Sequence, residues 1–445
     1  MSDKTKSDKT KSDKTPADQT TPQVRRRRVF YIPGYDPIHP RRYRELYRTE
    51  GSAQADISGY DIALSPRAGE NYGWHVDATM EGQTTQAEVE VLVWSDIVRG
   101  SMASSIPATY LQLIRTAYTY IASGALRRLM WLRKGPVIAA LYPVGMLLVQ
   151  LMTAIGLGVL AAKAFGWLWV GGGQMIIAAL SSGEGSALDG SAISVGRTVL
   201  QWALGGAVAW WVLNWFKAKD GKFFAYYLMH DYAYSAHYKG ANPPELEARM
   251  SQFKETIGAA LRDDVDEVLV VGHSSGAHLA VSILADLIRE GGVATGGPAL
   301  GFLSLGQVVP MVSFLPDAHR LRGDLQSLST RGELTWVDVT APGDGCAFAL
   351  CDPVAVSGVA PAGQKWPLVL SAAFTQTLSP ARWKALRWKF FRLHFQYLCA
   401  FDRVGDYDYF RITAGPMTLR DRFAGRKPSK SRIEIAASKY TSVAP

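Results

Sequence analysis

One short stretch of the sequence holds residues whose types and spacing could support covalent catalysis. Gly272, Ser274 and Gly276 are spaced two apart, after an apolar, β-prone run and before apolar residues at helical spacing. A strand, a sharp turn and a helix around Gly-x-Ser-x-Gly are typical of a nucleophile elbow, in which a strained turn lifts the serine hydroxyl above the end of a sheet. Side chains at the two glycines would collide with the neighbouring strand and helix. The pattern predicts that Ser274 is a nucleophile, although the bare motif also occurs by chance.

A glycine also follows an apolar run at 28–33, which is expected to be the first strand. Gly34 and Tyr35 begin a loop that must turn tightly before a helix-forming stretch at 40–50. A glycine in this place lets backbone N–H groups approach a substrate oxygen, which is what an oxyanion hole requires. The alternative is an ordinary turn between a strand and a helix.

The order of the expected elements indicates the fold class. Further strands are expected at 72–80, 87–93, 299–312 and 333–340, and an amphipathic helix at 243–261 leads into the strand before Ser274. Repeated strand, helix, strand order predicts an α/β protein with a mostly parallel sheet covered by helices.

These features together resemble the α/β-hydrolase superfamily, in particular its serine esterases and lipases. The resemblance covers about residues 28–415 and is interrupted at about 100–222. It implies a catalytic domain in two parts, 28–99 and 223–416, on either side of an insertion.

The resemblance also implies which residues act together. In that superfamily the catalytic residues run nucleophile, acid and then histidine along the chain. Asp344 lies in a turn after a late strand, and of eight histidines only His394 follows it. Ser274 then matches the nucleophile, Asp344 the acid and His394 the base. The N–H groups of Ser275 and of the Gly34–Tyr35 region match the oxyanion hole.

The sequence departs from the family pattern in three ways. It lacks the early strands that usually precede the oxyanion strand, and it lacks an HGGG loop. A second acid, Asp352, lies eight residues beyond Asp344, so the choice of acid stays open between the two. Without the order argument, His394 would be interpreted as a core or helix-surface histidine.

Two stretches are long and apolar enough to cross a bilayer. Residues 136–162 are 27 residues without a charge and 198–216 are 19 more, and about 20 apolar residues span the roughly 30 Å hydrocarbon core. Basic residues flank the pair on both outer sides, whereas 171–192 between them contains none. This asymmetry predicts a transmembrane hairpin of two spans, with the catalytic domain and both termini in the cytoplasm. The alternative is a long helix in a globular core.

The two ends of the chain are expected to lie outside the folded body. Residues 1–27 begin with a repeated polar five-residue unit, so we expect a disordered tail. The arginines at 25–28 are expected either to contact anionic surfaces or to form a solvated charge run before the first strand. Residues 417–445 are basic and are expected to be flexible or to lie on the membrane.

The composition limits the kinds of molecule that the protein is expected to bind. The 445-residue chain is 48% hydrophobic and has a formal net charge of +9, which fits a large core and an affinity for acidic surfaces such as membrane lipids. We expect no nucleic-acid partner. Cys346, Cys351 and Cys399 cannot all pair and form no Cys/His cluster, so we expect reduced thiols, no metal and no cofactor.

We therefore expect a membrane-anchored serine hydrolase that cleaves ester-type acyl bonds by a Ser-His-Asp mechanism. Aromatic segments at 110–120 and 223–238 lie at both junctions of the insertion and favour a lipid-like substrate that enters from the bilayer, rather than a soluble ester. The same residues fit esterases, lipases, thioesterases and acyltransferases. An alternative from another class is an inactive membrane scaffold or binding protein on the same fold.

Overall fold

The centre of the protein is an eight-stranded sheet. The computed structural model describes residues 23–69, 71–102, 105–173 and 190–445. The strands lie in the order β2-β3-β4-β1-β5-β6-β7-β8, in which the pairs β2–β3 and β3–β4 are antiparallel and all other neighbours are parallel. Their bounds are β1 Arg26–Ile32, β2 Asp61–Pro66, β3 Gly73–Met80, β4 Gln83–Val91, β5 Glu267–His273, β6 Ala299–Leu305, β7 Leu334–Thr340 and β8 Leu368–Ser371. The expectation of a mostly parallel sheet flanked by helices is confirmed.

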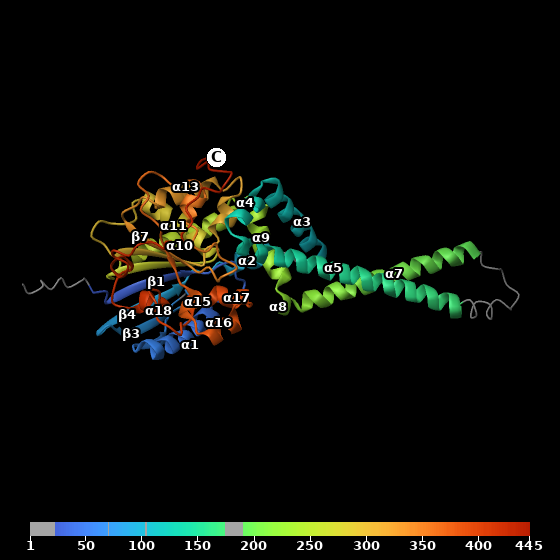
Figure 1. Cartoon of the computed structure of the whole chain (residues 1–445), viewed down its shortest axis with the longest axis horizontal. Helices are drawn as coiled ribbons and strands as arrows, with labels where there is room; N and C mark the ends of the chain where they lie inside the picture. The colour runs from blue at the N-terminus through green and yellow to red at the C-terminus, as the bar shows by residue number, and fades with distance from the viewer. Residues whose placement is uncertain (1–22, 70, 103–104, 174–189) are drawn as a thin grey trace, which may run out of the picture.

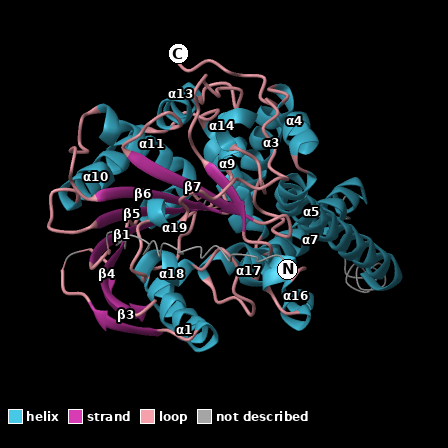
Figure 2. Ribbon diagram, turned by 60° about the vertical axis from the view of Figure 1, so that its left-hand side comes forward, coloured by secondary structure: helices cyan, strands magenta, loops and turns pink. Residues whose placement is uncertain are grey.

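Helices cover both faces of this sheet (Figure 2). Every residue of β5 is buried, which is typical of a strand with both faces covered. Leu269 and Val271 belong to a core shared with α1 and α18, whereas Val268 and Val270 belong to a core shared with α10, α11 and α13. These helices span Arg41–Ser58 (α1), Tyr409–Ala414 (α18), Pro244–Ala260 (α10), Gly276–Arg289 (α11) and His319–Leu328 (α13).

Most of the chain between β4 and β5 is helical. It forms α2 Ser95–Ser101, α3 Ile106–Ala122, α4 Ala125–Leu132, α5 Lys134–Leu168 with a π turn at Trp169–Gly173, α7 Gly190–Ala218, α8 Asp220–Phe223 and α9 Ala225–His237. The remaining short helices are α12 Val309–Ser313, α14 Pro353–Val356, α15 Phe374–Thr377, α16 Pro380–Leu386, α17 Phe390–His394, a 3₁₀ turn at Phe395–Leu398 and α19 Leu419–Arg422.

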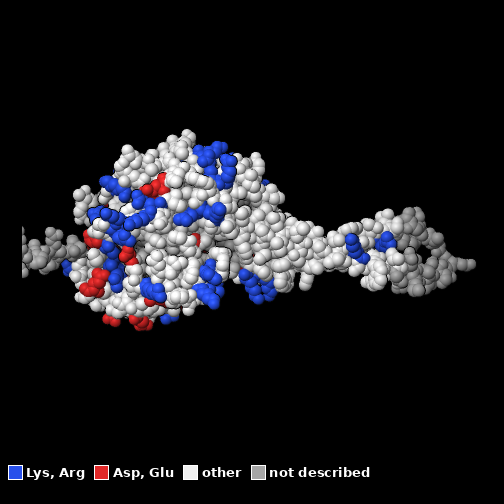
Figure 3. Space-filling view, viewed as in Figure 1, with Lys and Arg blue, Asp and Glu red and all other residues white. Residues whose placement is uncertain are grey.

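Helices α5 and α7 run side by side away from the body (Figure 1). They touch where Gly158 meets Gly205, since a Cβ on Gly158 would lie 2.6 Å from the Gly205 carbonyl oxygen. Within the described residues, α5 is the one helix that is long and apolar enough to cross a membrane by length and composition. Figure 3 shows no charged residue along the middle of the visible face of this pair. The predicted connection at 171–192 lies mostly outside the described residues.

The boundary expected for the N-terminal tail is wrong at its last residues. β1 begins at Arg26, and Arg27 is buried with an exposure of 1%. Its guanidinium pairs with Glu267 at 2.6 Å and donates to the carbonyl oxygens of Gly415 and Met417. A buried charge is tolerated when it is paired and hydrogen-bonded in this way. Arg27 is therefore part of the core and does not belong to a solvated tail. The repeated unit at 1–22 lies outside the described residues.

The expectation that the C-terminal tail is flexible is also wrong, whereas the alternative, a tail that lies on the membrane, stays a prediction. After α19 the chain lies along the body, where the N–H of Ser429 donates to Val369 and the N–H of Ile433 donates to Leu350. Near the end, the guanidinium of Arg322 donates to the carbonyl oxygen of Ser442. The backbone supplies these contacts, so the basic composition of the segment did not predict them.

Candidate active site

Ser274 lies in a strained turn between β5 and α11. Its φ angle is +56°, in the left-handed region that side chains other than glycine rarely adopt and that costs about 1–3 kcal/mol. The N–H of Ser274 donates to the carbonyl oxygen of Leu305 at the end of β6, at 2.9 Å. Such strain, held in place by the neighbouring strand, is found at functional positions.

The glycines around Ser274 allow three segments to meet. A Cβ on Gly272 would lie 2.8 Å from the Cα atom of Ala277 in α11. One on Gly276 would overlap the carbonyl oxygen of Ile32 in β1, and one on Gly34 would lie 2.9 Å from the Cβ of Ser274. The predicted collision of side chains with the neighbouring strand and helix is therefore confirmed.

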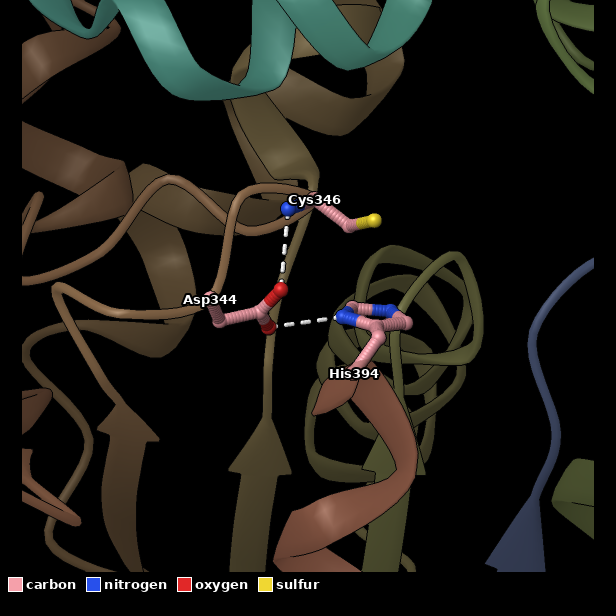
Figure 4. Close-up of side chains that lie close together, drawn as sticks. All are labelled: Asp344, Cys346 and His394. Carbon is pink, nitrogen blue, oxygen red and sulfur yellow. Dashed lines mark hydrogen bonds and ion pairs between the residues drawn. The ribbon is translucent and has the colours of Figure 1, made fainter. Parts of the chain in front are cut away.

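Asp344 and His394 are brought together from 50 residues apart (Figure 4). His394 ends α17, and its Nδ1 lies 2.7 Å from Oδ2 of Asp344, which follows β7. Asp344 also accepts hydrogen bonds from the N–H of Cys346 at 2.8 Å and from the hydroxyl of Tyr397 at 3.0 Å. Burial alone would raise the pKa of Asp344, but the interaction with the His394 imidazole and these hydrogen bonds hold it below its usual range. The ionised carboxylate therefore orients the imidazole with Nδ1 as donor.

The other nitrogen of His394 is free to accept a proton. Its Nε2 is buried and has no hydrogen-bond partner among the described residues. His394 and Ser274 line the same cavity of about 60 Å³. No hydrogen bond joins Nε2 to the Ser274 hydroxyl within the described structure, and such bonds are often formed only when substrate is bound. The pair has the components of a nucleophile and its general base.

Part of the wall of this cavity comes from the helices between β4 and β5. It includes one residue of α3, the beginning of α5, several residues of α9, and residues near α12 and α17. Most of these side chains are apolar or aromatic, among them Tyr120, Pro136, Leu228, Tyr232, Met311 and Phe391. The cavity therefore suits an apolar ligand next to a few polar groups.

The residues expected to form the oxyanion hole lie around Ser274. Ser275 lines the cavity, whereas Gly34 touches Ser274 from the β1 side. The carbonyl oxygen of Tyr35 accepts a hydrogen bond from the hydroxyl of Tyr227. The N–H groups of Ser275 and Tyr35 donate no backbone hydrogen bond within the described residues. They are available as donors, and their role as an oxyanion hole stays a prediction.

Comparison of the chain with protein-family models, curated proteins and solved structures finds no match.

The second candidate acid has a different place. Asp352 precedes α14, where its Oδ1 accepts from the N–H groups of Val354 and Ala355 and its Oδ2 accepts from Gln364 at 2.7 Å. These contacts are those of a helix cap. Of the two acids that the sequence left open, Asp344 is the one that contacts His394.

Three groups near the cavity could also be considered as metal ligands. The candidate ligand atoms of Asp344, Cys346 and His394 lie within 4.8 Å of one another. A hydrogen bond already joins two of these residues. Burial and the charge of Asp344 raise the pKa of the Cys346 thiol, which therefore stays protonated and is a poor ligand. The arrangement fits proton transfer better than cation binding.

Two positioning residues escaped sequence reasoning. His273 bonds through its Nε2 to the carbonyl oxygen of His394 at 3.0 Å. Burial lowers the pKa of His273 to about 3, so it is neutral and can donate this bond. Tyr397 bonds to Asp344 and accepts from the N–H of Ala341. His273 lies inside the Gly-x-Ser-x-Gly motif, and this position was the one feature of the sequence that could have indicated its role. No feature of the sequence singled out Tyr397.

Proposed function

We propose that this chain is a membrane-anchored serine hydrolase of the α/β-hydrolase type that cleaves ester-type acyl bonds in lipid-like substrates. One observation carries the proposal: His394, held by Asp344, has an Nε2 without a hydrogen-bond partner among the described residues, and it lines the cavity that also contains the strained Ser274. The alternative, a scaffold without activity, does not require a serine in a costly conformation beside a base with a free nitrogen.

The proposed reaction proceeds by acyl transfer. Nε2 of His394 takes the proton of Ser274 as its oxygen attacks the ester carbonyl, and Asp344 stabilises the imidazolium. N–H groups of Ser275 and the Gly34–Tyr35 region hold the tetrahedral oxyanion. His394 then protonates the departing alcohol. Water, activated by the same nitrogen, attacks the acyl-enzyme and releases the acid and free Ser274.

We infer that α5 and α7 both cross the bilayer. The most apolar stretch of α5 is only 22% buried, so its apolar side chains are not covered as those of a soluble core helix would be; Met152, for example, is 71% exposed. Lys163 and Arg197 occur towards the far ends of the two helices, where long basic side chains can reach the interface. Basic residues next to the body favour a cytoplasmic catalytic domain and cytoplasmic termini.

The position of the first residues of α5 favours a lipid-like substrate. Pro136 lines the cavity, and Gly135 lies against the loop of the acid, with Gly345 Cα 3.6 Å from where its Cβ would be. The guanidinium of Arg133 donates to Ala349 in the same loop. The helix that would enter the membrane therefore begins at the wall of the site. A cavity of about 60 Å³ has room for about two waters, so an acyl chain must extend beyond it.

Labelling of membranes by a fluorophosphonate probe tests the proposed function. Wild-type protein should be labelled, and Ser274→Ala should lose both labelling and ester hydrolysis at equal expression, by several orders of magnitude in kcat. Ser235→Ala is the matched control, because Ser235 lines the same cavity without the elbow. Equal labelling of Ser274→Ala would reject the nucleophile, and unlabelled wild-type protein would favour the scaffold alternative.

A further inference from the structure

The cavity holds a second carboxylate that the reaction does not use. Asp231 lies on α9 and lines the cavity together with Ser274, Ser275 and His394. The side chains of Ser275 and His394 both lie close enough to lower its pKa. Asp344 already holds Nδ1 of His394, so Asp231 is not needed as the acid of the triad.

Asp231 is unusually placed for a structural carboxylate. Burial raises its pKa to about 7, and the opposing effects of His394 and Ser275 offset only part of that rise. No lysine or arginine forms an ion pair with it within the described residues. A desolvated, unpaired carboxylate is costly and is a marker of function when it lines a cleft.

Apart from the imidazole of His394, the titratable groups that face Asp231 are four tyrosines and one thiol, all neutral. Its charge acts on one residue after β1, one on α3, two on α9 and one in the loop after β7, namely Tyr35, Tyr120, Tyr227, Tyr232 and Cys346. Much of the remaining cavity wall is apolar. A carboxylate beside the developing oxyanion would oppose catalysis, unless a donor group of the substrate lies between the two charges.

We propose that Asp231 is a specificity-determining residue that accepts a hydrogen bond from a hydroxyl or ammonium group next to the scissile ester. The inference rests on the proposed function and narrows its substrates to acyl esters of polyols or amino alcohols. A partial glyceride with one acyl chain has this chemistry: an apolar chain for the apolar wall, an ester for Ser274 and a free hydroxyl for Asp231. A fully substituted ester would leave the carboxylate buried without a partner, and buried polar groups that lose their partner discriminate strongly.

The test compares three esters of one fatty acid on the purified full-length protein in detergent: a monoacylglycerol, the same ester with both hydroxyls methylated, and a 2-aminoethyl ester. Wild-type enzyme should prefer at least one donor-bearing ester over the methylated one by about 10²-fold in kcat/KM. The ratio should fall close to one in Asp231→Leu and partly in Asp231→Asn, and stay high in Asp352→Asn, whose carboxylate caps α14 outside the cavity. Because it is a ratio, it does not depend on the amount of folded enzyme.

The outcomes separate the two proposals. Preference for the monoacylglycerol alone identifies a hydroxyl as the donor, and preference for the aminoethyl ester identifies an ammonium group. Equal wild-type rates on all three esters, or a preference that survives Asp231→Leu, overturn this inference and leave the hydrolase intact. Wild-type protein that neither reacts with the fluorophosphonate nor hydrolyses any ester overturns the proposed function, and this inference with it.

Discussion

The contacts of Asp344 make its replacement by asparagine a sharp test of the site. The carboxylate accepts from His394 on one oxygen and from Cys346 on the other. An asparagine has one acceptor oxygen and one NH₂ group. If the NH₂ faces His394, Nδ1 must accept, the proton moves to Nε2, and the imidazole can no longer take the proton of Ser274. If it faces the N–H of Cys346, two donors confront each other.

The size of the effect follows from this geometry. The variant loses both the correct tautomer and the negative charge that stabilises the imidazolium, and such a loss costs about 10⁴-fold in kcat. This corresponds to about 5.5 kcal/mol of transition-state stabilisation. The structure offers Asp352→Asn as a control, since asparagine caps a helix about as well as aspartate. Its activity should stay within about threefold of the wild-type value.

Hydrolysis of a chromogenic short-chain ester by the detergent-purified variants measures both effects, with thermal unfolding recorded for each protein. We expect Asp344→Asn to be folded and nearly inactive. If Asp344→Asn keeps more than about a tenth of wild-type kcat, or if Asp352→Asn is the more damaging change, Asp344 is not the acid and its bond to His394 is structural.

Three further changes test the fold and the helix pair. Gly276→Ala places a Cβ against backbone of β1 and should cost more than about 4 kcal/mol in the free energy of unfolding, whereas Gly100→Ala, which has open space, should cost nothing measurable in a denaturant titration. Burial raises the pKa of Asp338 to about 8, so the folded protein keeps a proton that the unfolded chain loses above pH 4. Stability should then fall as pH rises from about 4 to 8, and Asp338→Asn should make this fall smaller and raise the melting temperature at pH 8; an unchanged profile contradicts the assignment. Gly158→Leu should force α5 from α7 and lower the aggregation temperature of the solubilised protein. Gly145→Leu should not, because a Cβ at Gly145 has no neighbour within 4 Å among the described residues; equal effects would mean that the close contact contributes little.

The elbow was predictable because its information is local. The glycines and Ser274 lie within five residues, and each glycine is required by backbone that packs within a few residues of the motif or against β1. The expected mostly parallel sheet rested likewise on patterns that each strand carries by itself. β2 and β8 were missed for the same reason: β2 is largely exposed, and β8 has only four residues, so neither shows a clear apolar period.

What the sequence did not reveal depends on distant partners. By sequence alone, Arg27 is one of four consecutive arginines. Its buried position becomes clear only from its ion pair with Glu267, far along the chain. The choice between Asp344 and Asp352 needed the position of His394, which only the packing of α17 provides. Asp231 lies in no recognisable motif. Its place in the cavity depends on the packing of α9 near the turn that follows β5. Burial and pairing across elements are properties of the fold, and single-sequence patterns do not record them.

The position of β1 has a consequence for the ribosome-bound chain. β1 pairs with β4 on one side and β5 on the other, and its residues bond to partners 240 positions later in the sequence. At about 5–20 residues per second, roughly 12–50 s of translation separate the two strands. During that time β4 can pair with β1, but the opposite side of β1 stays unpaired and offers its N–H and C=O groups to any other strand. The arginines at the start of β1 reduce this hazard, because charge on an open strand discourages pairing between chains. The two helices proposed to enter a bilayer, α5 and α7, are translated within the same interval, before β5 to β8 can complete the sheet.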